Sequence, residues 1–341
     1  MSLTAPQVLH KLLERADLTR EEMLDVMHSV MSGAFTPAQI AGLLVALRQK
    51  GETVEEIAAA ASVMRELSTK VAVTVDTHLI DTCGTGGDGI QTFNVSTLGA
   101  IVAAAAGARV AKHGGRSVSS TCGSADVLEA LGVNVNLSPE EVAASVDAIG
   151  IGFMFAPNYH SAMKHAAPVR RELGVRTLFN LLGPLTNPAG ARRQVMGVFD
   201  RQLTGKLARV LASLGSAHVL VVHGADGMDE ISFAGDTYVA ELKGGEVREY
   251  VLNPQQFGMS LHRAETIRVS NAAESRLMIE EVLSGAQGPA RDIVLLNAGA
   301  AIYVADQAAS LAQGIARAAE VIDNGAARAK LQQLITFSNQ A

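Results

Sequence analysis

The sequence contains no tryptophan and only two cysteines, Cys83 and Cys122, among its 341 residues. Two cysteines are too few for a disulfide framework and do not have the spacing of a zinc site, so we expect a reduced, cytoplasmic protein. The net charge is −6, and no long run of one sign interrupts the chain. This charge excludes a general nucleic-acid surface from our expectations.

Long hydrophobic runs are also missing. The run Leu98–Ala106 has about half the length that a bilayer-spanning helix needs. Residues 1–6 show no basic stretch followed by an apolar core, so we expect no signal peptide and no membrane partner. What is abundant is Ala, Val, Leu and Ile, within a hydrophobic share of 48%. This composition is typical of helices packed on a parallel sheet.

Residues 1–70 predict helices only. Three pairs have the capping-box pattern, in which a hydroxyl caps a free amide of the first turn and a side chain three residues later reaches back: Thr19 with Glu22, Thr36 with Gln39, and Thr53 with Glu56. The apolar residues between them recur at helical spacing. We therefore expect a small helical bundle at the N-terminus.

From residue 71 the chain alternates between short apolar runs and helical segments. We expect strands at 71–73, 78–81, 109–111, 151–155, 194–199, 218–222 and 292–296, and a hairpin of 237–242 with 247–251. Helices are expected at about 97–106, after Ser138, between 199 and 218, and at the C-terminus. Strands that alternate with helices predict a mostly parallel sheet flanked by helices, and so an α/β fold.

The segment 81–89 is rich in glycine and contains Gly84-Thr85-Gly86-Gly87-Asp88 directly after an expected strand. Glycines let backbone amides approach an anion, and the following helix offers its free amides to phosphate. The structural alternative is a tight turn between strand and helix. No Lys-Ser or Lys-Thr pair closes the loop as in a Walker A motif, and Asp88 does not suit a dinucleotide fingerprint.

Two further polar segments follow. Asn94-Val95-Ser96-Thr97 places three short polar side chains at the expected start of a helix, where a single cap would suffice. The segment 112–120, with Lys112 and two glycines, follows the next strand and suits a pyrophosphate. Two anion loops after successive strands can share one ligand, although each alone can be a surface loop or a helix cap.

The adjacent carboxylates of Asp229 and Glu230 follow another expected strand. Taken alone they predict a solvated acidic turn, but beside a pyrophosphate they favour a magnesium site. Arg170 is a candidate clamp for a carboxylate, with a surface charge as the alternative. Nothing near Cys83 marks it as a nucleophile, and we assign Cys122 to packing.

On these motifs, together with 123–126 and the stretch from Arg176 to Pro188, nearly the whole chain resembles the anthranilate phosphoribosyltransferase family of tryptophan biosynthesis. The resemblance implies a small helical domain over 1–70, with a returning segment at about 165–190, and a large α/β domain over 71–341. It also implies a homodimer, two Mg²⁺ ions per monomer, and the substrates phosphoribosyl pyrophosphate (PRPP) and anthranilate.

The resemblance implies a role for each site residue. The expected PRPP contacts are Gly84, Gly87, Asp88, Thr92, Asn94, Val95, Ser96, Thr97, Lys112, His113, Gly114, Gly115, Arg116, Ser117, Val118, Ser119, Ser120 and Ser124. The expected anthranilate contacts are Gly84, Gly115 and Arg170, and the expected metal ligands are Ser96, Asp229 and Glu230. The family commonly has Asn where this chain has Gly115, so the contact of that position with the acceptor changes here.

Two other functions remain open on the sequence. Pyrimidine nucleoside phosphorylases share part of 176–188 and Gly-Ser-Ala-Asp, but a Lys-His-Ser-Thr-Gly-Gly pattern is expected in their first loop, where this chain has 81–87. A non-catalytic relative that binds nucleic acid would need a basic groove and eroded magnesium ligands. The phosphoribosyl transfer itself needs no covalent nucleophile and no strong general base, because an aryl amine attacks as the neutral species.

Overall fold

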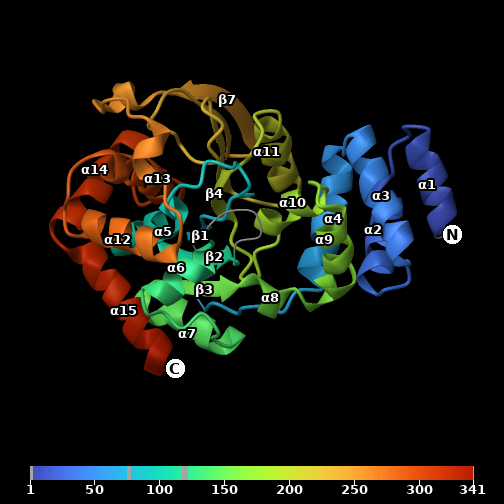
Figure 1. Ribbon diagram of the computed structural model, residues 1–341, viewed down its shortest axis with the longest axis horizontal. Coiled ribbons are helices and arrows are strands. Elements are labelled where there is room, and N and C mark those ends of the chain that lie inside the picture. The colour runs from blue at the N-terminus through green and yellow to red at the C-terminus, as the bar shows by residue number, and fades with distance from the viewer. Residues whose placement is uncertain (1–2, 75–77, 117–121, 341) are drawn as a thin grey trace.

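The computed structural model describes residues 3–74, 78–116 and 122–340. Figure 1 shows four N-terminal helices beside a larger body built around a sheet. They are α1 (Ala5–Leu13), α2 (Arg20–Met31), α3 (Pro37–Lys50) and α4 (Val54–Glu66). All three predicted capping boxes are present at the starts of α2, α3 and α4. The predicted helical bundle is confirmed.

The sheet of the larger domain has the order β3-β2-β1-β4-β5-β6-β7. Its strands are β1 (Leu79–Asp81), β2 (Arg109–Gly114), β3 (Ile151–Phe155), β4 (Arg193–Gly197), β5 (His218–Gly224), β6 (Thr237–Lys243) and β7 (Glu246–Leu252). The five strands from β3 to β5 pair in parallel, and β6 and β7 add an antiparallel hairpin at one edge. The mostly parallel sheet and the hairpin were both predicted.

The strand order reverses at β1. The chain runs from β1 outward to β2 and β3 and then returns to β4 on the other side of β1. Loops at the carboxyl ends of strands diverge at such a point and leave a crevice where ligands bind. The glycine loop follows β1, Lys112 lies in β2, and Asp229 and Glu230 come after β5. The topology therefore brings the predicted motifs together at the carboxyl ends of the parallel strands.

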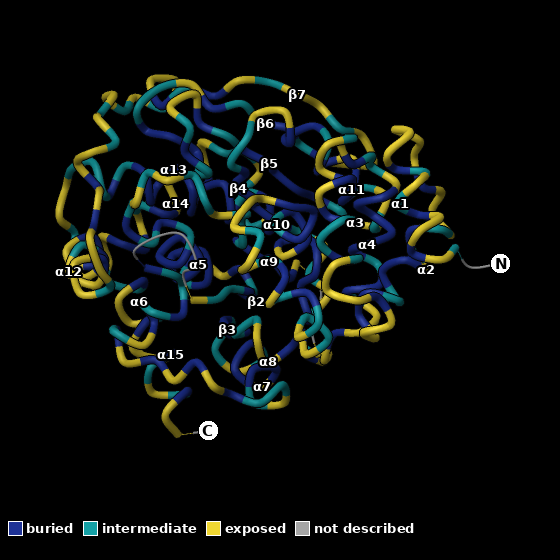
Figure 2. The backbone as a smooth tube through the Cα atoms, turned by 45° about the vertical axis from the view of Figure 1, so that its right-hand side comes forward, coloured by how far each residue is buried: buried dark blue, intermediate teal, exposed yellow. Residues whose placement is uncertain are grey.

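Helices cover both faces of this sheet, as Figures 1 and 2 show. Those in contact with the strands are α5 (Val95–Ala105), α7 (Pro139–Ile149), α8 (Ala156–Tyr159), α11 (Leu203–Ser213) and α13 (Pro289–Val304). Packed on these helices, on the bundle or on one another are α6 (Ser124–Ala130), α9 (Ala167–Leu173), α10 (Phe179–Leu182), α12 (Ala272–Leu283), α14 (Leu311–Asp323) and α15 (Ala326–Gln340). Short 3₁₀ turns lie at η1 (Ser161–His165), η2 (Gly183–Leu185), η3 (Pro254–Phe257) and η4 (Ala264–Ile267).

Successive residues of the central strands belong to different cores. Val195 in β4 and Leu220 in β5 join the core formed with α5 and α13, whereas Met196 and Val221 join the core that continues into the helical bundle. This division follows from the alternation of side chains along a strand. The second core includes residues of α3, α4 and α11. The helical bundle therefore packs against α11, one of the helices that cover the sheet.

Two predicted strands are wrong. Residues 292–296 lie in α13, a helix that begins at Pro289 and is buried along almost its whole length. A helix enclosed on all sides is apolar all round, so its sequence lacks the alternation between apolar and polar faces that identifies a surface helix. Residues 71–73 also form no strand; the Val71 amide donates to the Pro188 carbonyl instead.

A buried ion pair fixes the loop between α3 and α4. Lys50 Nζ lies 2.9 Å from Glu56 Oε2, and Glu56 also accepts hydrogen bonds from the Leu18 and Thr53 amides. We expect Glu56→Ala to lower the free energy of unfolding by about 3 kcal/mol, because Lys50 is left buried with only the exposed Asp17 as counter-charge. Urea unfolding measures this loss, and Glu55→Ala on the exposed side of the same helix should change little.

Candidate active site

The glycine loop lies against the end of β4 at a distance that only glycine permits. A Cβ at Gly84 would stand 2.8 Å from the Gly197 carbonyl oxygen, and a Cβ at Gly197 would overlap the Asp229 carbonyl oxygen. The Thr85 amide donates to the Gly197 carbonyl at 2.8 Å, and Thr85 Oγ1 accepts from the Phe199 amide. Three backbone segments, after β1, β4 and β5, are thus stacked in direct contact.

Gly86 and Gly87 adopt positive φ angles of 63° and 80°, which let the loop turn with its amides accessible. The loop then leads to Thr92, which forms an isolated antiparallel bridge with Arg268. Helix α5 begins at Val95, two residues earlier than predicted. Its first turn therefore lies directly behind the loop, where the Val95 and Thr97 amides donate to the Phe93 and Asn94 carbonyls and the Ser96 amide donates to Glu230.

Lys112 is buried below this first turn. Its Nζ donates to the carbonyl and the hydroxyl of Thr82, at 3.2 and 3.1 Å, and to Ser96 Oγ at 3.3 Å. The ammonium lowers the pKa values of the neighbouring Asp81 and Glu230 carboxyls, against the larger effect of their burial. Lys112 thus supplies a fixed positive charge between the two predicted anion loops.

The carboxylates of Asp88, Asp229 and Glu230 come together from two loops. Asp88 Oδ2 accepts weakly from the Asp229 amide at 3.5 Å. Burial and repulsion from Asp88 raise the pKa of Asp229 to about 7. Burial and repulsion from Asp229 raise the pKa of Glu230 well above its ordinary value, while a hydrogen bond from the Ser96 backbone lowers it. Partly buried carboxylates that repel one another are suited to a divalent cation, which would relieve the repulsion.

Asn94 is held by partners that the sequence did not indicate. Its Oδ1 accepts from Ser275 Oγ at 2.7 Å and from Cys122 Sγ at 3.2 Å, and its Nδ2 donates to the Cys122 carbonyl. Asn94 occupies the N-cap position of α5 without a side-chain capping bond. Cys122 lies in the core, as predicted. Among the described residues Thr97 Oγ1 is buried without a hydrogen-bond partner.

The second loop is described as far as Arg116. Arg116 pairs with Glu129 and Asp126 on α6, at 2.6 and 3.0 Å, so its guanidinium is engaged on the protein side. A Cβ at Gly114 would collide with Ser124 Oγ, which places the start of α6 directly against this loop. Ser117, Val118, Ser119 and Ser120, which we predicted to contact PRPP, lie outside the described residues.

Arg170 lies on α9, which packs against α3 of the helical domain. Its guanidinium stands over the Phe179 ring, with 5.5 Å from Cζ to the ring centroid. Burial lowers the pKa of Arg170. Partial burial removes some of the water that would hydrate this guanidinium. A bound carboxylate would replace that hydration, so Arg170 is suited to bind one.

His113 and His160 stand edge to face, with ring centroids 5.1 Å apart. Burial lowers the pKa of His113 to about 3 and that of His160 to about 4. Both rings are therefore neutral at neutral pH. Cys83 is no nucleophile either, because burial raises the pKa of its thiol to about 12.

The lowered histidine pKa values predict acid sensitivity. The unfolded chain binds a proton near pH 6.5 and the folded chain only near pH 4 at His160, so stability is lost as the pH falls through this window. We expect the free energy of unfolding to fall less steeply in His160→Asn, by up to about 1.4 kcal/mol per pH unit. Urea unfolding at pH 7.5, 6 and 5 measures the slope; equal slopes in both proteins would contradict the prediction.

The stretch 176–188 supports the glycine loop from behind, a role that sequence reasoning missed. Asn187 Nδ2 donates to Asp81 Oδ2 at 2.7 Å and to the Ala111 carbonyl at 2.9 Å, which ties β1 to β2. Gln194 Nε2 donates to the Cys83 and Pro184 carbonyls. Asp81 itself accepts from the His113 amide. In the sequence, the only sign of this network was the presence of amide side chains, Asn187 and Gln194, in and after a loop-rich stretch.

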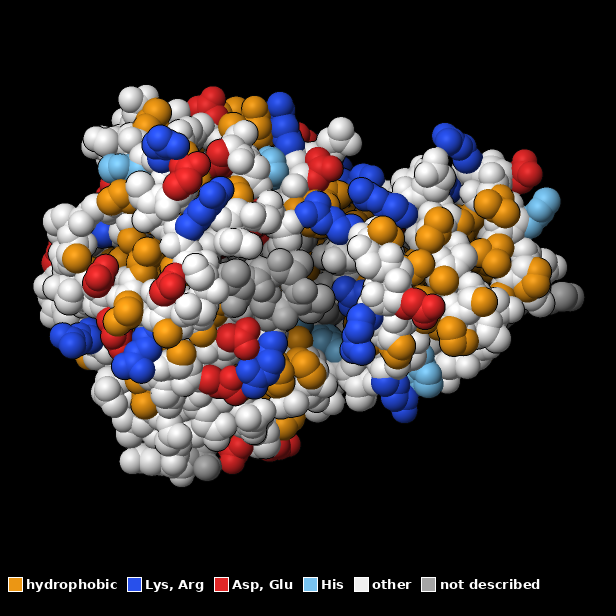
Figure 3. Space-filling model, viewed as in Figure 1, with side chains coloured by type: hydrophobic (Ala, Val, Ile, Leu, Met, Phe, Trp, Pro, Cys, Tyr) orange, Lys and Arg blue, Asp and Glu red, His pale blue; other side chains and the backbone are white. Residues whose placement is uncertain are grey.

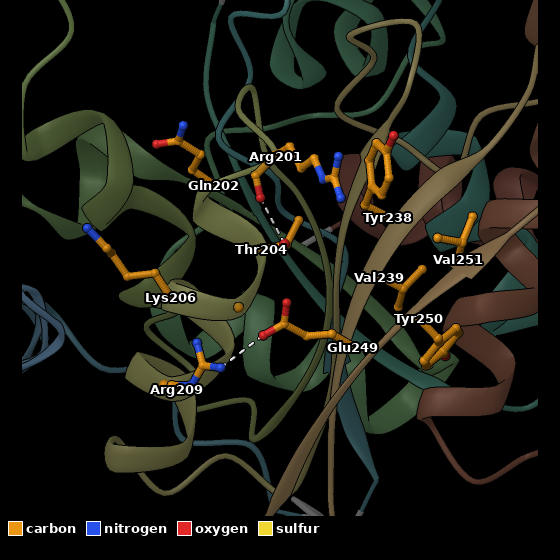
Figure 4. Close-up of a pocket in the computed structure, with 11 residues that line it drawn as sticks. Arg201, Gln202, Thr204, Lys206, Arg209, Tyr238, Val239, Glu249, Tyr250 and Val251 are labelled. Carbon is orange, nitrogen blue, oxygen red and sulfur yellow. Dashed lines mark hydrogen bonds and ion pairs between the residues drawn. The ribbon is translucent and has the colours of Figure 1, made fainter.

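Two other features of the described residues lie apart from the predicted metal ligands. Asp81, Cys83 and His113 place one ligand atom each within 4.8 Å of the others, but Asp81 is already bonded to His113 and Asn187. A groove of about 700 Å³ between α11 and the β6–β7 hairpin, shown in Figure 4, contains none of the predicted site residues.

Within the described chain no helix has both the length and the apolar character to cross a membrane.

Comparisons with known proteins agree with this geometry. Residues 6–68 match the model of the glycosyl transferase family, helical bundle domain, and residues 76–328 match that of the glycosyl transferase family, a/b domain. Anthranilate phosphoribosyltransferases of Methylobacillus flagellatus and Thiobacillus denitrificans are 66% and 63% identical to this chain, over 100% and 99% of both partners.

Solved structures give the same result. The anthranilate phosphoribosyltransferase of Thermus thermophilus superimposes with a TM-score of 0.92 at 44% identity, covering 97% of this chain and 99% of that one. That of Saccharomyces cerevisiae, in complex with PRPP and Mg, gives 0.88 at 28% identity, covering 99% and 98%. The yeast enzyme in complex with 4-fluoroanthranilate gives 0.89 at 27% identity, with the same coverage.

Proposed function

The chain belongs to the anthranilate phosphoribosyltransferase family, and from this premise we propose how its own residues carry out the family's reaction. The enzyme transfers the phosphoribosyl group of PRPP to anthranilate and releases pyrophosphate, in the second step of tryptophan biosynthesis from chorismate. The observation that carries the assignment of residues is the stacking of the glycine loop, Gly197 and the Asp229 backbone, with buried Lys112 bonded to Thr82 just before that loop.

PRPP binds in the crevice beside β1. The amides of the glycine loop face its phosphates, α5 begins behind this loop, and Lys112 and Ser96 face the phosphates from below. Asn94 acts by holding the α5 start against Ser275. Arg116 acts through α6, because Glu129 and Asp126 already occupy its guanidinium. The segment 117–120 completes the second wall, as the family resemblance implies.

Magnesium accompanies PRPP. We assign two Mg²⁺ ions per monomer, one at Ser96 and one at Asp229 and Glu230, with Asp88 beside the second; the crowding of these partly buried carboxylates supports this assignment. Mg²⁺ on the pyrophosphate neutralises the charge that develops on the leaving group. A bound cation would offset the repulsion that raises the pKa values of Asp229 and Glu230, so we expect metal and donor to bind together.

Anthranilate enters between α9 and the glycine loop. Arg170 binds its carboxylate, and the Gly84 backbone and Gly115 face its ring. Gly115 leaves room on this side, since a Cβ built there meets no described atom within 4 Å. A backbone amide or a water then takes the place of the side chain that the family commonly has here.

The chemistry requires positioning more than proton transfer. The neutral amine of anthranilate attacks the anomeric carbon as the bond to pyrophosphate breaks, with an oxocarbenium-like centre between them. The protein orients the amine and stabilises the leaving charge with Lys112 and the loop amides. The neutral histidines and the protonated Cys83 thiol agree with a reaction that uses no covalent nucleophile.

A direct assay tests this function. Purified protein is mixed with Mg²⁺, PRPP and anthranilate, and the loss of anthranilate fluorescence is followed. We expect a loss that requires all three components. A constant signal at high enzyme concentration would exclude anthranilate as acceptor, and phosphorolysis of thymidine or uridine in a parallel reaction would identify a nucleoside phosphorylase instead.

Membership of the family also leads us to propose the domain division, the oligomeric state and the location of this protein. We assign a division into a helical domain over 1–70 with a returning segment at about 165–190 and an α/β domain over 71–341, which the packing of α9 on α3 and α10 on α4 supports. A homodimer through the helical domain and a cytoplasmic location complete the assignment. Leu13 and Val45 are 73% and 48% exposed on α1 and α3, and Figure 3 shows hydrophobic side chains on that domain.

Sedimentation of the purified protein tests the dimer. We expect the mass of two chains for the wild type and of one chain for Leu13→Asp with Val45→Asp, because charges on these exposed positions would be desolvated in the interface. The exposed Leu277 on α12, far along the chain in the α/β domain, provides the matched control. A wild type that sediments as one chain would contradict the assignment.

A further inference from the structure

Arg176 reaches from the segment between α9 and α10 to the glycine loop. Its Nη2 donates a hydrogen bond to the Gly87 carbonyl, 89 positions earlier in the chain. The same guanidinium lies over the Phe199 ring, with 4.1 Å from Cζ to the ring centroid. Arg176 is exposed and therefore not part of a hydrophobic core, and among the described residues no salt bridge holds it at this place.

The three partners belong to the loops that surround the donor. Gly87 lies in the glycine loop after β1, and Phe199 follows β4. The Phe199 amide donates to Thr85 Oγ1 at 3.2 Å, so Phe199 is already fixed to the same loop from its other side. Arg176 therefore closes a ring of contacts that runs from Thr85 through Phe199 and Arg176 to Gly87.

This contact fixes the orientation of one peptide unit. In a planar trans peptide the carbonyl and the next N–H point in opposite directions. With the Gly87 carbonyl bound to Arg176, the Asp88 N–H points away from Arg176, and the carbonyl oxygen cannot turn toward an anionic ligand. Gly87 has a φ of 80° and no side chain to restrict the unit, so an external contact is needed to hold it.

Arg176 is also joined to the acceptor side. Helix α9, which carries Arg170, ends at Gly174 in the left-handed conformation, where the Gly174 amide donates to the Arg170 carbonyl. Two residues later Arg176 contacts the glycine loop, and the Thr177 amide is bound by the Asn180 side chain at the start of α10. The chain between Arg170 and the donor loop is therefore short and held at both ends.

We propose that Arg176 is a positioning residue for the phosphoribosyl donor, which acts through the Gly87 carbonyl and links the donor loop to the helix that carries the acceptor-binding Arg170. The inference rests on the proposed function in one respect, that the glycine loop binds PRPP. Arg176 itself touches no substrate. We expect Arg176 to affect the affinity for PRPP, because the loop amides must be aligned before they can bind the pyrophosphate.

Steady-state kinetics of four variants test this role. In Arg176→Ala we expect the KM for PRPP to rise about tenfold, the loss of one charge-assisted hydrogen bond, while kcat changes less than twofold. Arg176→Lys should be intermediate, since its ammonium keeps a hydrogen bond to Gly87 but loses the planar stacking on Phe199. Phe199→Leu should raise the same KM by a smaller factor.

The double variant separates positioning from simple attraction between Arg176 and the pyrophosphate. If Arg176 and Phe199 act as one unit, Phe199→Leu adds less than twofold to the KM in the Arg176→Ala background. Fully additive effects would attribute the loss to charge alone and overturn the proposal. Arg201→Ala is the matched control, because Arg201 also stacks on an aromatic ring, that of Tyr238 at 3.6 Å, in the groove of Figure 4.

The wild type measured in parallel keeps two failures apart. A wild-type protein that does not consume anthranilate would contradict the proposed function itself. An active wild type, together with an Arg176→Ala protein of equal thermal stability whose KM for PRPP stays within twofold, would overturn the role of Arg176 alone.

Discussion

Exchanging Asp229 for asparagine and Glu230 for glutamine lowers kcat/KM for PRPP by at least about 100-fold and raises the Mg²⁺ concentration needed for half-maximal rate. Both substitutions keep the shape of the side chains and remove their charge. Because the two carboxylates are partly buried beside Asp88, few other groups in the site can replace them as cation ligands. Initial rates over a range of Mg²⁺ concentrations measure both effects.

The same variant should be more stable than the wild type without metal. Burial and mutual repulsion raise the pKa values of Asp229 and Glu230, so their ionisation at neutral pH opposes folding in the metal-free protein. Thermal unfolding with and without Mg²⁺ and PRPP shows this: the variant starts at a higher Tm and gains less on addition of the ligands. A merely misfolded variant would have a lower Tm.

Glu246→Gln with Glu249→Gln provides the control for charge. It removes two negative charges from the exposed edge strand β7 and should leave both the Mg²⁺ dependence and the Tm gain as in the wild type. An unchanged Mg²⁺ dependence in the Asp229 and Glu230 variant would remove these residues from the metal site.

The parts of the fold that could be predicted are those with local causes. The capping boxes at Thr19, Thr36 and Thr53 are complete within four residues, and the structure contains each of them. The strands 151–155 and 218–222 are short β-branched or apolar runs between turns, and both form. Local hydrogen bonding and side-chain shape are sufficient to determine such elements.

The parts that could not be predicted depend on distant residues. Helix α13 has the composition of a buried strand because the sheet and the surrounding helices cover it, and this cover is not visible in its own sequence. In the site, Ser275 binds Asn94 from a helix that begins 177 positions after α5 does. Arg116 pairs with Glu129 and Asp126 on α6, partners that the sequence did not indicate.

The glycine loop lies between these two cases. Its composition indicated an anion site, but the reason for a glycine at position 84 lies in the backbone of Gly197, more than a hundred residues later. Gly197 in turn has no room for a side chain because the Asp229 carbonyl covers it. A sequence shows that glycine is present, and only the packing shows which of the glycines has a neighbour that excludes a methyl group.

This packing predicts a large effect for Gly84→Ala. The new Cβ would stand 2.8 Å from the Gly197 carbonyl oxygen and 3.1 Å from its nitrogen, closer than real Cβ contacts. Gly197 cannot retreat, since Asp229 lies directly behind it, so the glycine loop must move outward. We expect kcat/KM to fall about 100-fold, the effect of a displacement near 1 Å on a positioned reaction.

The loss should divide between the substrates in a way that identifies its cause. Thr85 would lose its hydrogen bond to the Gly197 carbonyl, so the donor loop is disturbed, whereas Arg170 on α9 keeps its place over Phe179. The KM for PRPP should therefore rise more than that for anthranilate. Gly235→Ala, where a Cβ meets no described atom within 4 Å, should keep full activity. The Gly84 backbone also faces anthranilate, so the KM for anthranilate should rise too, but less, because Arg170 keeps its place over Phe179. Equal rises in both KM values would instead indicate a general collapse of the crevice.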